Sequence, residues 1–290
     1  MKGIILAGGS GTRLHPSTLS VSKQLLPVYD KPMIYYPLST LMLAGVNEIL
    51  IISNPEFINS YQNLLGDGST WGMRFEYVSQ QKPRGLADAF ILGEDFVENK
   101  PVSMILGDNI LYGSTLVEKL QDATKIEKGA IVFAYQVKDP ERFGIVEFDQ
   151  NHKAISLEEK PKKPKSNYAI PGVYFYDGNV STYAKSLKPS HRGEIEITDL
   201  NRIYLELDQL DVKVLGRGVA WLDAGTPEAL LQAANFIQAV QDRQGFKISC
   251  PEEIALRMKF INRNQFKDII KQCKNPDYKK YLEVLLHQEY

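Results

Sequence analysis

The first 135 residues alternate short apolar runs with amphipathic segments, and this order constrains the fold more than any other feature. Runs of this kind have the length and residue types of buried strands, and they occur at 2–7, 48–53, 74–78, 102–106 and 130–135. The segments between them have helical spacing at 33–45, 55–65, 86–94 and 115–124. Strands that alternate with helices predict an α/β fold, with a doubly wound, mostly parallel sheet covered by helices on both faces.

The pattern changes after about residue 140. Segments 145–148, 154–157 and 172–176 are strand-like, and we expect them to form a small antiparallel addition over the edge of the main sheet. Helical spacing follows at 179–187, 197–207 and 227–241, and beyond about residue 246 the chain looks wholly helical. We therefore expect an α/β core over 1–245 and a C-terminal helical extension over 246–290, packed on the core or at a subunit interface.

Composition limits the classes of function. The 34 Lys and Arg residues nearly balance the 35 Asp and Glu residues, which argues against binding to nucleic acid or to a membrane surface. Only two cysteines occur, Cys250 and Cys273, and neither belongs to a CxxC pair, which argues against a disulfide framework or a structural zinc site. This cysteine usage fits a reducing cytoplasm, where we expect the protein to reside. No segment approaches the length and apolarity of a membrane span.

A glycine-rich loop, GGSGTR at residues 8–13, directly follows the first predicted strand. Glycines let backbone N–H groups form an anion cradle at the carboxyl end of a parallel strand. The loop is not a dinucleotide fingerprint, because Leu14 stands where a third glycine is needed, and the chain has no Gly-Lys pair for a P-loop. Arg13 and the later Lys23 add two cations, a combination that suits a triphosphate better than an ordinary tight turn.

Two aspartates are candidate metal ligands. Asp108 follows a predicted buried strand in the sequence LGDN, and Asp223 lies beside a glycine in WLDAGT. Magnesium prefers oxygen ligands and commonly takes one or two carboxylates together with substrate phosphates. Because 115 residues separate the two aspartates, their spacing does not show that they meet, and each could instead cap a turn.

The run GGSGTRLHPSTLSVSKQLLPVYDKPM resembles the sugar-1-phosphate nucleotidylyltransferases, whose pattern is Gly-Thr-Arg-Leu, Pro-x-Thr, Lys-x-x-Leu-Pro and Lys-Pro-Met in this order. The resemblance extends to about residue 260 and implies a doubly wound nucleotide-binding domain. It also implies Mg²⁺-dependent transfer of a nucleotide, with dTTP and glucose 1-phosphate as substrates. Use of UTP or another sugar phosphate is an alternative, and so is a non-catalytic nucleotide-sugar sensor, although a sensor would be expected to lose the charged groups.

The same resemblance implies roles for individual residues. The positions that hold the metal are Asp108 and Asp223. Those implied to act in catalysis are Arg13, Lys23, Asp108 and Lys160. Those implied to bind the nucleotide are Gly8, Gly9, Gly11, Thr12, Arg13, Lys23, Gln24, Gln80, Gly85 and Asp108. Those implied to bind the sugar phosphate are Gly144, Glu159, Lys160, Val173 and Trp221.

The chemistry of several of these side chains suits the implied roles. Glu159 can accept hydrogen bonds from sugar hydroxyls, Lys160 can engage a phosphate, and Trp221 offers the sugar an apolar face. The amide of Gln80 can pair with the imide edge of thymine or uracil. The chain departs from the family pattern at Phe143, where many relatives carry Tyr, so one polar contact near the sugar is in doubt.

The C-terminal segment around Pro251 has helical spacing, for which packing or a subunit contact is the simplest interpretation. It also resembles the part of this family that lines a second nucleotide-sugar site, used for feedback inhibition. That resemblance implies roles for Glu253, Ile254 and Arg257. It further implies a homo-oligomer, commonly a tetramer.

Overall fold

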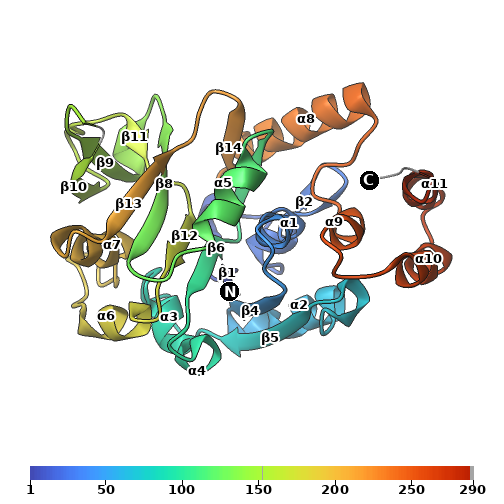
Figure 1. Cartoon of the computed structure of the whole chain (residues 1–290), viewed down its shortest axis with the longest axis horizontal. Coiled ribbons are helices and arrows are strands. Elements are labelled where there is room, and N and C mark those ends of the chain that lie inside the picture. Colours follow the sequence, from blue (N-terminus) through green and yellow to red (C-terminus); the bar gives the residue numbers. More distant parts are fainter. Residues whose placement is uncertain (152, 288–290) are drawn as a thin grey trace.

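The computed structural model describes residues 1–151 and 153–287 (Figure 1). Its centre is a mixed, mostly parallel sheet. Within the described residues this sheet has ten strands, namely β1 (Lys2–Leu6), β4 (Glu48–Ser53), β5 (Arg74–Ser79), β6 (Val102–Leu106), β8 (Ala130–Gln136), β9 (Gly144–Phe148), β10 (Ala154–Glu159), β11 (Tyr168–Ala169), β12 (Val173–Tyr176) and β13 (Leu210–Val214).

The strand order is β10-β9-β11-β8-β12-β6-β1-β4-β5, with β13 paired to β8 outside this path. Strand β1 runs parallel to β4 and β6, β4 runs parallel to β5, and β13 runs parallel to β8. The predicted α/β class with a mostly parallel sheet is therefore confirmed. Strands β9, β10 and β11 pair antiparallel at one end of the sheet, as expected for the addition.

The expected placement of segment 172–176 was wrong. This segment forms β12, which lies inside the main sheet, antiparallel to β6 on one side and to β8 on the other. All four residues of β12 are buried, as expected of a strand covered on both faces, but such a short apolar run does not show which strands it pairs with. Strand β13 was not predicted; none of its residues is fully buried, and it adds to the sheet only through β8.

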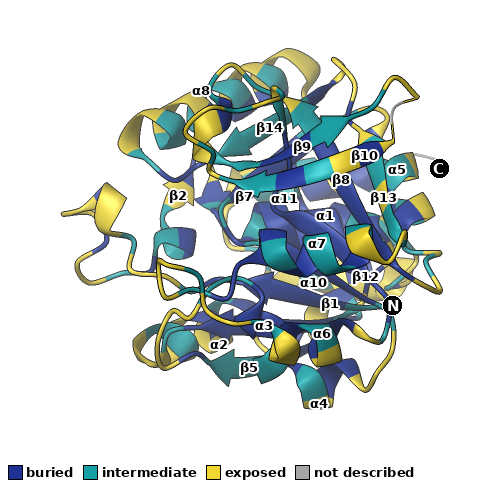
Figure 2. Ribbon diagram, turned by 90° about the vertical axis from the view of Figure 1, so that its left-hand side faces the viewer, coloured by how far each residue is buried: buried dark blue, intermediate teal, exposed yellow. Residues whose placement is uncertain are grey.

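Helices cover both faces of the sheet, and they are α1 (Tyr35–Leu43), α2 (Ile58–Leu65), α3 (Asp88–Leu92), α4 (Glu94–Val97), α5 (Leu116–Ala123), α6 (Val180–Ser186), α7 (Ile197–Glu206), α8 (Pro227–Gln244), α9 (Pro251–Arg257), α10 (Arg263–Gln272) and α11 (Pro276–Leu285). Alternate strand residues point to opposite faces. Ile5 accordingly packs with α1, α2, α5 and the C-terminal helices, whereas Ile4 packs with α3, α4, α6 and α7. Figure 2 shows the resulting arrangement, with buried strands between helices whose outer sides are exposed.

Two small ribbons stand beside the main sheet. Strands β2 (Pro27–Val28) and β3 (Lys31–Pro32) form a hairpin, and β7 (Asn109–Gly113) pairs antiparallel with β14 (Val219–Asp223). Helix α8 packs on both ribbons through a separate apolar cluster that includes Ile110 and Ile237. The second ribbon matters for the site, because it joins segments far apart in the sequence.

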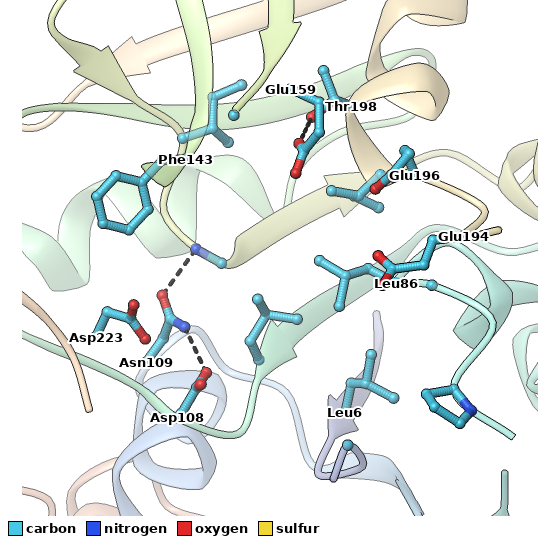
Figure 3. A pocket seen from close by; sticks show the side chains of 18 of the residues that line it. Leu6, Leu86, Asp108, Asn109, Phe143, Glu159, Glu194, Glu196, Thr198 and Asp223 are labelled. Carbon is cyan, nitrogen blue, oxygen red and sulfur yellow. Dashed lines mark hydrogen bonds between the residues drawn. The ribbon is translucent and has the colours of Figure 1, made fainter. Parts of the chain in front are cut away.

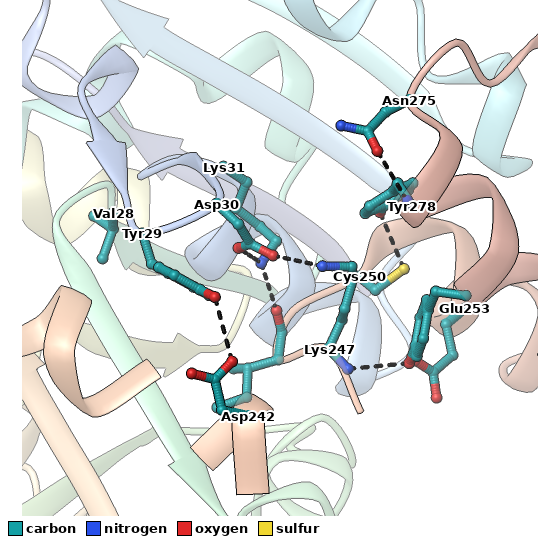
Figure 4. Close-up of polar contacts among 12 residues, drawn as sticks. Val28, Tyr29, Asp30, Lys31, Asp242, Lys247, Cys250, Glu253, Asn275 and Tyr278 are labelled. Carbon is teal, nitrogen blue, oxygen red and sulfur yellow. Dashed lines mark hydrogen bonds and ion pairs between the residues drawn. The ribbon is translucent and has the colours of Figure 1, made fainter. Parts of the chain in front are cut away.

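The hairpin also anchors the segment between α8 and α9 (Figure 4). The buried Lys31 ammonium donates to the Ile248 carbonyl at 2.9 Å and pairs with the Asp30 carboxylate at 2.5 Å. Asp30 also pairs with Lys247 at 2.8 Å. These cations and hydrogen bonds together hold the pKa of Asp30 below its ordinary value, although burial opposes them. Lys31, part of the Lys-Pro-Met motif, thus ties the C-terminal part of the chain to the hairpin.

Helices α9, α10 and α11 follow Gly245. Helix α9 packs on α1, and α10 and α11 pack on α9 and on each other at the red end of the chain in Figure 1. The helical character expected beyond residue 246 is confirmed for the described residues. The division of the chain into a core and an extension at residue 245 stays a prediction. Among the described residues, no helix combines the length and the apolarity needed to cross a membrane.

Docking of the C-terminal helices depends on Gly72. Its φ is +66°, and a Cβ at this position would lie 2.1 Å from the carbonyl oxygen of Phe260. We expect Gly72→Ala to lower the free energy of unfolding by about 2–5 kcal/mol, because backbone strain and overpacking add. Urea denaturation measures this loss.

Gly245→Ala is the matched control. Gly245 also has a left-handed backbone, with φ +73°, but a Cβ there would meet nothing within 4 Å. Its loss should stay near 1–2 kcal/mol, the cost of the backbone conformation alone. Equal losses in the two variants would contradict the steric argument.

Candidate functional site

The glycine loop turns sharply after β1. Gly9 and Gly11 have φ values of +105° and +60°, which glycine adopts without a Cβ clash. The Gly11 carbonyl accepts a hydrogen bond from Thr18 at 2.8 Å, and the Gly9 N–H donates to Asn54 Oδ1 at 3.2 Å. The Gly9 amide is therefore already engaged, and the other amides of the loop are the candidates for an anion cradle.

Gln24 is hydrogen-bonded to the backbone of this loop. Its Oε1 accepts hydrogen bonds from Ser22 at 2.8 Å and from Tyr61 at 3.3 Å, and its Nε2 donates to the Gly8 carbonyl at 3.4 Å. The side chain is only 3% exposed. Gln24 lines the cavity, but its amide is used within the protein, so its predicted contact with the nucleotide would compete with these bonds.

Asp108 and Lys23 form a close ion pair at the carboxyl end of β6. Burial pushes the pKa of Asp108 upward, but the Lys23 charge and the hydrogen bonds from Lys23 and Asn109 outweigh burial and hold this pKa below its ordinary value. The lysine thus neutralises the carboxylate in the described structure. A cation bound at Asp108 would free the Lys23 ammonium for a phosphate.

Asp223 reaches the same corner through the β7–β14 ribbon, which places it directly opposite Asn109. Burial and then the nearby charge of Asp108 raise the pKa of Asp223, although Lys23, Arg13 and Arg142 oppose this. A Cβ at Gly225 would lie 3.2 Å from both Arg13 Nη2 and Asp223 Oδ1. The β7–β14 ribbon therefore brings Asp223 to the same cavity as Asp108, which the spacing in the sequence could not show.

Asn109, which the sequence did not single out, joins several parts of the site (Figure 3). Its Nδ2 donates to Asp108 Oδ1 at 3.0 Å, and its Oδ1 accepts from the Gly172 N–H at 2.9 Å and from Trp221 Nε1 at 2.6 Å. Asn109 is 3% exposed. One buried amide thus fixes the Asp108 carboxylate, the start of β12 and the indole ring of Trp221.

The opposite side of the cavity is built by the antiparallel addition. Glu159, at the end of β10, accepts a hydrogen bond at 2.5 Å from Thr198, a residue of α7 (Figure 3). Gly144 of β9 lies opposite Glu159 in the antiparallel pairing of β9 with β10. A Cβ at Gly144 would lie 2.9 Å from Thr198 Oγ1. Lys160 follows with φ +43°, an uncommon backbone for a residue with a side chain, and it also lines the cavity.

Aromatic rings form one wall of this side. The rings of Phe143 and Trp221 lie 5.0 Å apart, and Arg142 stands over Phe143 at 5.3 Å. Arg142 Nη2 also approaches Asp223 Oδ2 at 3.9 Å. The aromatic surface expected at position 143 is present, and the guanidinium of Arg142 adds a cation that sequence reasoning did not select.

Gln80 and Gly85 line the far end of the cavity. Gln80 Nε2 donates to Asp88 Oδ2 at 2.9 Å. Gly85 has φ +106°, and a Cβ there would lie 2.3 Å from the Ile195 carbonyl oxygen. Only glycine allows the chain to run this close to the segment before α7, which closes the cavity on this side.

These residues surround one cavity of about 480 Å³, a size typical of small-molecule sites. Thirteen of the predicted site residues line it: Gly8, Gly9, Arg13, Lys23, Gln24, Gln80, Gly85, Asp108, Gly144, Glu159, Lys160, Trp221 and Asp223. Gly11, Thr12 and Val173 are not among the lining residues of the described chain. Lining residues that the sequence did not single out include Asn109, Arg142, Arg192, Glu194, Glu196 and Thr198.

Arg192 is a cavity-lining residue that the sequence did not indicate, because it belongs to no motif and follows no predicted strand. Its guanidinium contacts Glu196 at 3.2 Å and approaches Glu159 Oε1 at 3.8 Å. It comes from a turn before α7 that meets β10 only in the folded chain. The cavity thus carries cations at both ends, although the net charge of the whole chain is only −1.

The site fits a divalent cation. Asp108 and Asp223 supply oxygen donors, the type that Mg²⁺ prefers. Burial and the nearby Asp108 charge raise the pKa of Asp223, and a cation bound there would offset both effects. No cluster of three or more acidic, His or Cys side chains that could hold a metal occurs in the described residues. The remaining ligands would have to come from substrate or water.

The second predicted site lies elsewhere, on α9. Glu253 pairs with Arg257 at 2.6 Å and accepts a hydrogen bond from Tyr281 of α11. Ile254 is buried in the apolar cluster that contains Ile5, on the face of the sheet covered by α1, α2 and α5. None of these three α9 residues lines the cavity described above, and their role in binding a nucleotide sugar stays a prediction.

Comparison with known proteins identifies the class. The nucleotidyl transferase family model matches residues 2–240. The chain therefore belongs to the nucleotidyl transferase family, and it is an enzyme of that class. A divalent metal is general in this family, which agrees with the Asp108 and Asp223 pair.

Similar full-length relatives narrow the class further. The glucose-1-phosphate thymidylyltransferase of Xanthomonas campestris is 57% identical over 284 residues, which cover 98% of this chain and 96% of the relative. The Neisseria gonorrhoeae enzyme of the same name is 57% identical over 287 residues, 99% of each chain. That of Mycolicibacterium smegmatis is 54% identical over 289 residues, the full length of both.

Solved structures agree. A Bacillus anthracis protein described as a glucose-1-phosphate thymidylyltransferase, solved with sucrose, superimposes with a TM-score of 0.76 and 44% identity, covering 81% of this chain and 94% of that one. A UDP-glucose pyrophosphorylase with bound UDP-glucose gives a TM-score of 0.71 over 84% of this chain and 99% of that one. At 24% identity, the second similarity shows the fold alone.

The role of Asn109 as a buried hub can be tested by stability. We expect Asn109→Leu to lower the free energy of unfolding by about 2–4 kcal/mol, because the buried Gly172 N–H and the part-buried Trp221 Nε1 lose their acceptor. Asn54→Leu is the control, since its amide also bonds the backbone, at Gly9, but in an exposed place where water can substitute. A similar loss in both variants, measured by urea denaturation, would refute the hub.

Proposed function

We propose that this chain transfers a thymidylyl group from dTTP to α-D-glucose 1-phosphate, giving dTDP-glucose and pyrophosphate, with Mg²⁺ as the metal. The observation that carries the proposal is the meeting, in one cavity, of the Asp108 and Asp223 pair, the cations Arg13 and Lys23, and the sugar-side group around Glu159. The names of the full-length relatives support the choice of both substrates.

The reaction is an in-line displacement. A phosphate oxygen of glucose 1-phosphate attacks the α-phosphorus of dTTP, a new O–P bond forms, and the bond to the β-phosphate breaks with its electrons leaving on pyrophosphate. The attacking phosphate is already ionised near neutral pH, so no general base is needed. Catalysis then depends on positioning and on neutralising charge, as in phosphoryl transfer generally.

The cations divide this work. Arg13 and the free amides of the glycine loop hold the leaving β- and γ-phosphates, because the loop ends beside Arg13. Lys23, once released from Asp108, and Lys160 neutralise charge around the α-phosphate and the incoming phosphate. A metal held by Asp108 and Asp223 would supply further charge neutralisation on phosphate oxygens.

The sugar and base occupy opposite ends of the cavity in this proposal. Glu159, oriented by Thr198, accepts from sugar hydroxyls, and Trp221 gives the ring an apolar surface held in place by Asn109. Gly144 lines this end of the cavity and contributes a main-chain contact in this proposal, and Val173, which follows the lining residue Gly172, contributes another. Gln80 and Gly85 receive the base.

The substrate assignment is tested by pyrophosphate release. With glucose 1-phosphate and Mg²⁺, we expect release to be fastest with dTTP, and slower with dUTP by about 10-fold or more, since a missing methyl is worth about 1–3 kcal/mol. UTP, which lacks the methyl and also carries a 2′-hydroxyl, should be slower than dTTP as well. ATP, CTP and GTP should be poor substrates, and EDTA should abolish release. Folded protein that releases no pyrophosphate with any nucleotide would refute the proposal.

The metal-binding role of Asp108 is tested by Asp108→Asn. We expect kcat to fall about 100-fold or more, because a charge that holds the metal is lost. Thermal stability should fall much less than activity, because the isosteric side chain keeps the packing although Lys23 loses its counter-charge. Asp122→Asn is the control, since Asp122 of α5 forms an exposed ion pair with Lys213 of β13, and neither residue lines the cavity. A loss of folding in proportion to activity would instead indicate a structural role for Asp108.

A further inference from the structure

Asp88 is a fully buried carboxylate at the first residue of α3, and it does not line the cavity. Its Oδ2 accepts a hydrogen bond from Gln80 Nε2 at 2.9 Å, and its Oδ1 accepts from Arg84 Nη2 at 2.6 Å. Each carboxylate oxygen therefore has one partner. The fold brings a buried anion against the amide of a residue that faces the base end of the cavity.

This contact fixes which way the Gln80 amide faces. A glutamine amide has a donor side, Nε2, and an acceptor side, Oε1, and in isolation it can turn either way. A carboxylate paired with a guanidinium only accepts hydrogen bonds, so the donor side of Gln80 must face Asp88. The reversed amide would place two oxygens against each other in a buried place, which is costly.

The acceptor side of Gln80 is turned toward the glycine loop. A Cβ at Gly8 would lie 3.3 Å from Gln80 Oε1, so the missing side chain of Gly8 leaves this oxygen accessible from the cavity. In the described part of the chain, no group donates a hydrogen bond to Gln80 Oε1. The cavity thus presents a hydrogen-bond acceptor of fixed direction at this end.

We propose that Asp88 is a specificity-determining positioning residue, which holds the Gln80 carbonyl oxygen toward the base and so selects pyrimidines that carry an N3–H donor. This inference rests on the proposed function, because it takes Gln80 as a base contact. Thymine and uracil have a hydrogen at N3, and cytosine has a lone pair there. A glutamine amide that turns freely could hydrogen-bond to either kind of base. The Gln80 amide held by Asp88 can hydrogen-bond only to a base with an N3–H donor, such as thymine or uracil.

The direct test is Asp88→Asn in the full-length chain, with kcat/KM measured for dTTP and dCTP against glucose 1-phosphate. The asparagine is isosteric, and it can either accept or donate, so the Gln80 amide becomes free to turn. We expect the dTTP to dCTP ratio of kcat/KM to fall at least about 10-fold, through loss with dTTP and gain with dCTP. A ratio within about two-fold of the wild-type value in folded protein would overturn the proposal.

Arg84→Lys is the matched control. It keeps a cation beside the Asp88 carboxylate, so that Asp88 still only accepts hydrogen bonds, and it leaves the bond between Asp88 and Gln80 intact. Arg84 has a side chain that is 56% exposed and is not a cavity-lining residue, so its replacement should leave the nucleotide ratio unchanged. A ratio that falls equally in both variants would show that general loosening of this region, and not the direction of the amide, sets the preference.

A second measurement needs no variant and covers the case in which Asp88→Asn does not fold. N3-methyl-dTTP has a methyl group in place of the N3 hydrogen, so the wild-type chain should use it at least about 10-fold less well than dTTP. Equal use of the two nucleotides would overturn the proposal. If wild-type protein uses no nucleotide at all, the proposed function fails and this inference fails with it; if dTTP is used but the ratio does not move, only the role of Asp88 is refuted.

Discussion

The antiparallel pairing of β7 with β14 is the constraint on which the site depends. It sets Asp223 opposite Asn109, the residue next to Asp108, although more than 100 positions of sequence lie between them. Asn109 then uses its donor for Asp108 and its acceptor for Gly172 and Trp221. This ribbon therefore fixes the relative positions of the two carboxylates, the Trp221 ring and the start of β12.

Charge is balanced locally in this cavity. Lys23 neutralises Asp108, and Arg13 and Arg142 stand near Asp223, while Arg192 lies among Glu159, Glu194 and Glu196 at the other end. Buried charges without partners are costly, so each carboxylate that a ligand or metal would engage is paired in its absence. Such exchangeable pairs suit a site that must bind and release highly charged phosphates.

Several buried amides in this protein serve as oriented connectors. Gln24 faces the glycine loop because two hydroxyls occupy its oxygen, Gln80 faces the cavity with its oxygen because Asp88 occupies its nitrogen, and Asn109 is held on both sides. An amide has a direction only through its partners. Two of the partners that give these amides direction, Tyr61 for Gln24 and Asp88 for Gln80, are residues that no sequence motif marks.

The order of strands and helices, the glycine loop and its cations, and the character of the C-terminal segment follow from local sequence, because periodicity and turn residues act over a few positions. What the chain could not reveal alone is which distant segments pair. The placement of β12 within the main sheet, the β7–β14 ribbon, and the contributions of Arg192, Thr198 and Asp88 arise only when such segments meet. Backbone hydrogen bonds between strands carry no residue signature, so only the tertiary structure decided these contacts.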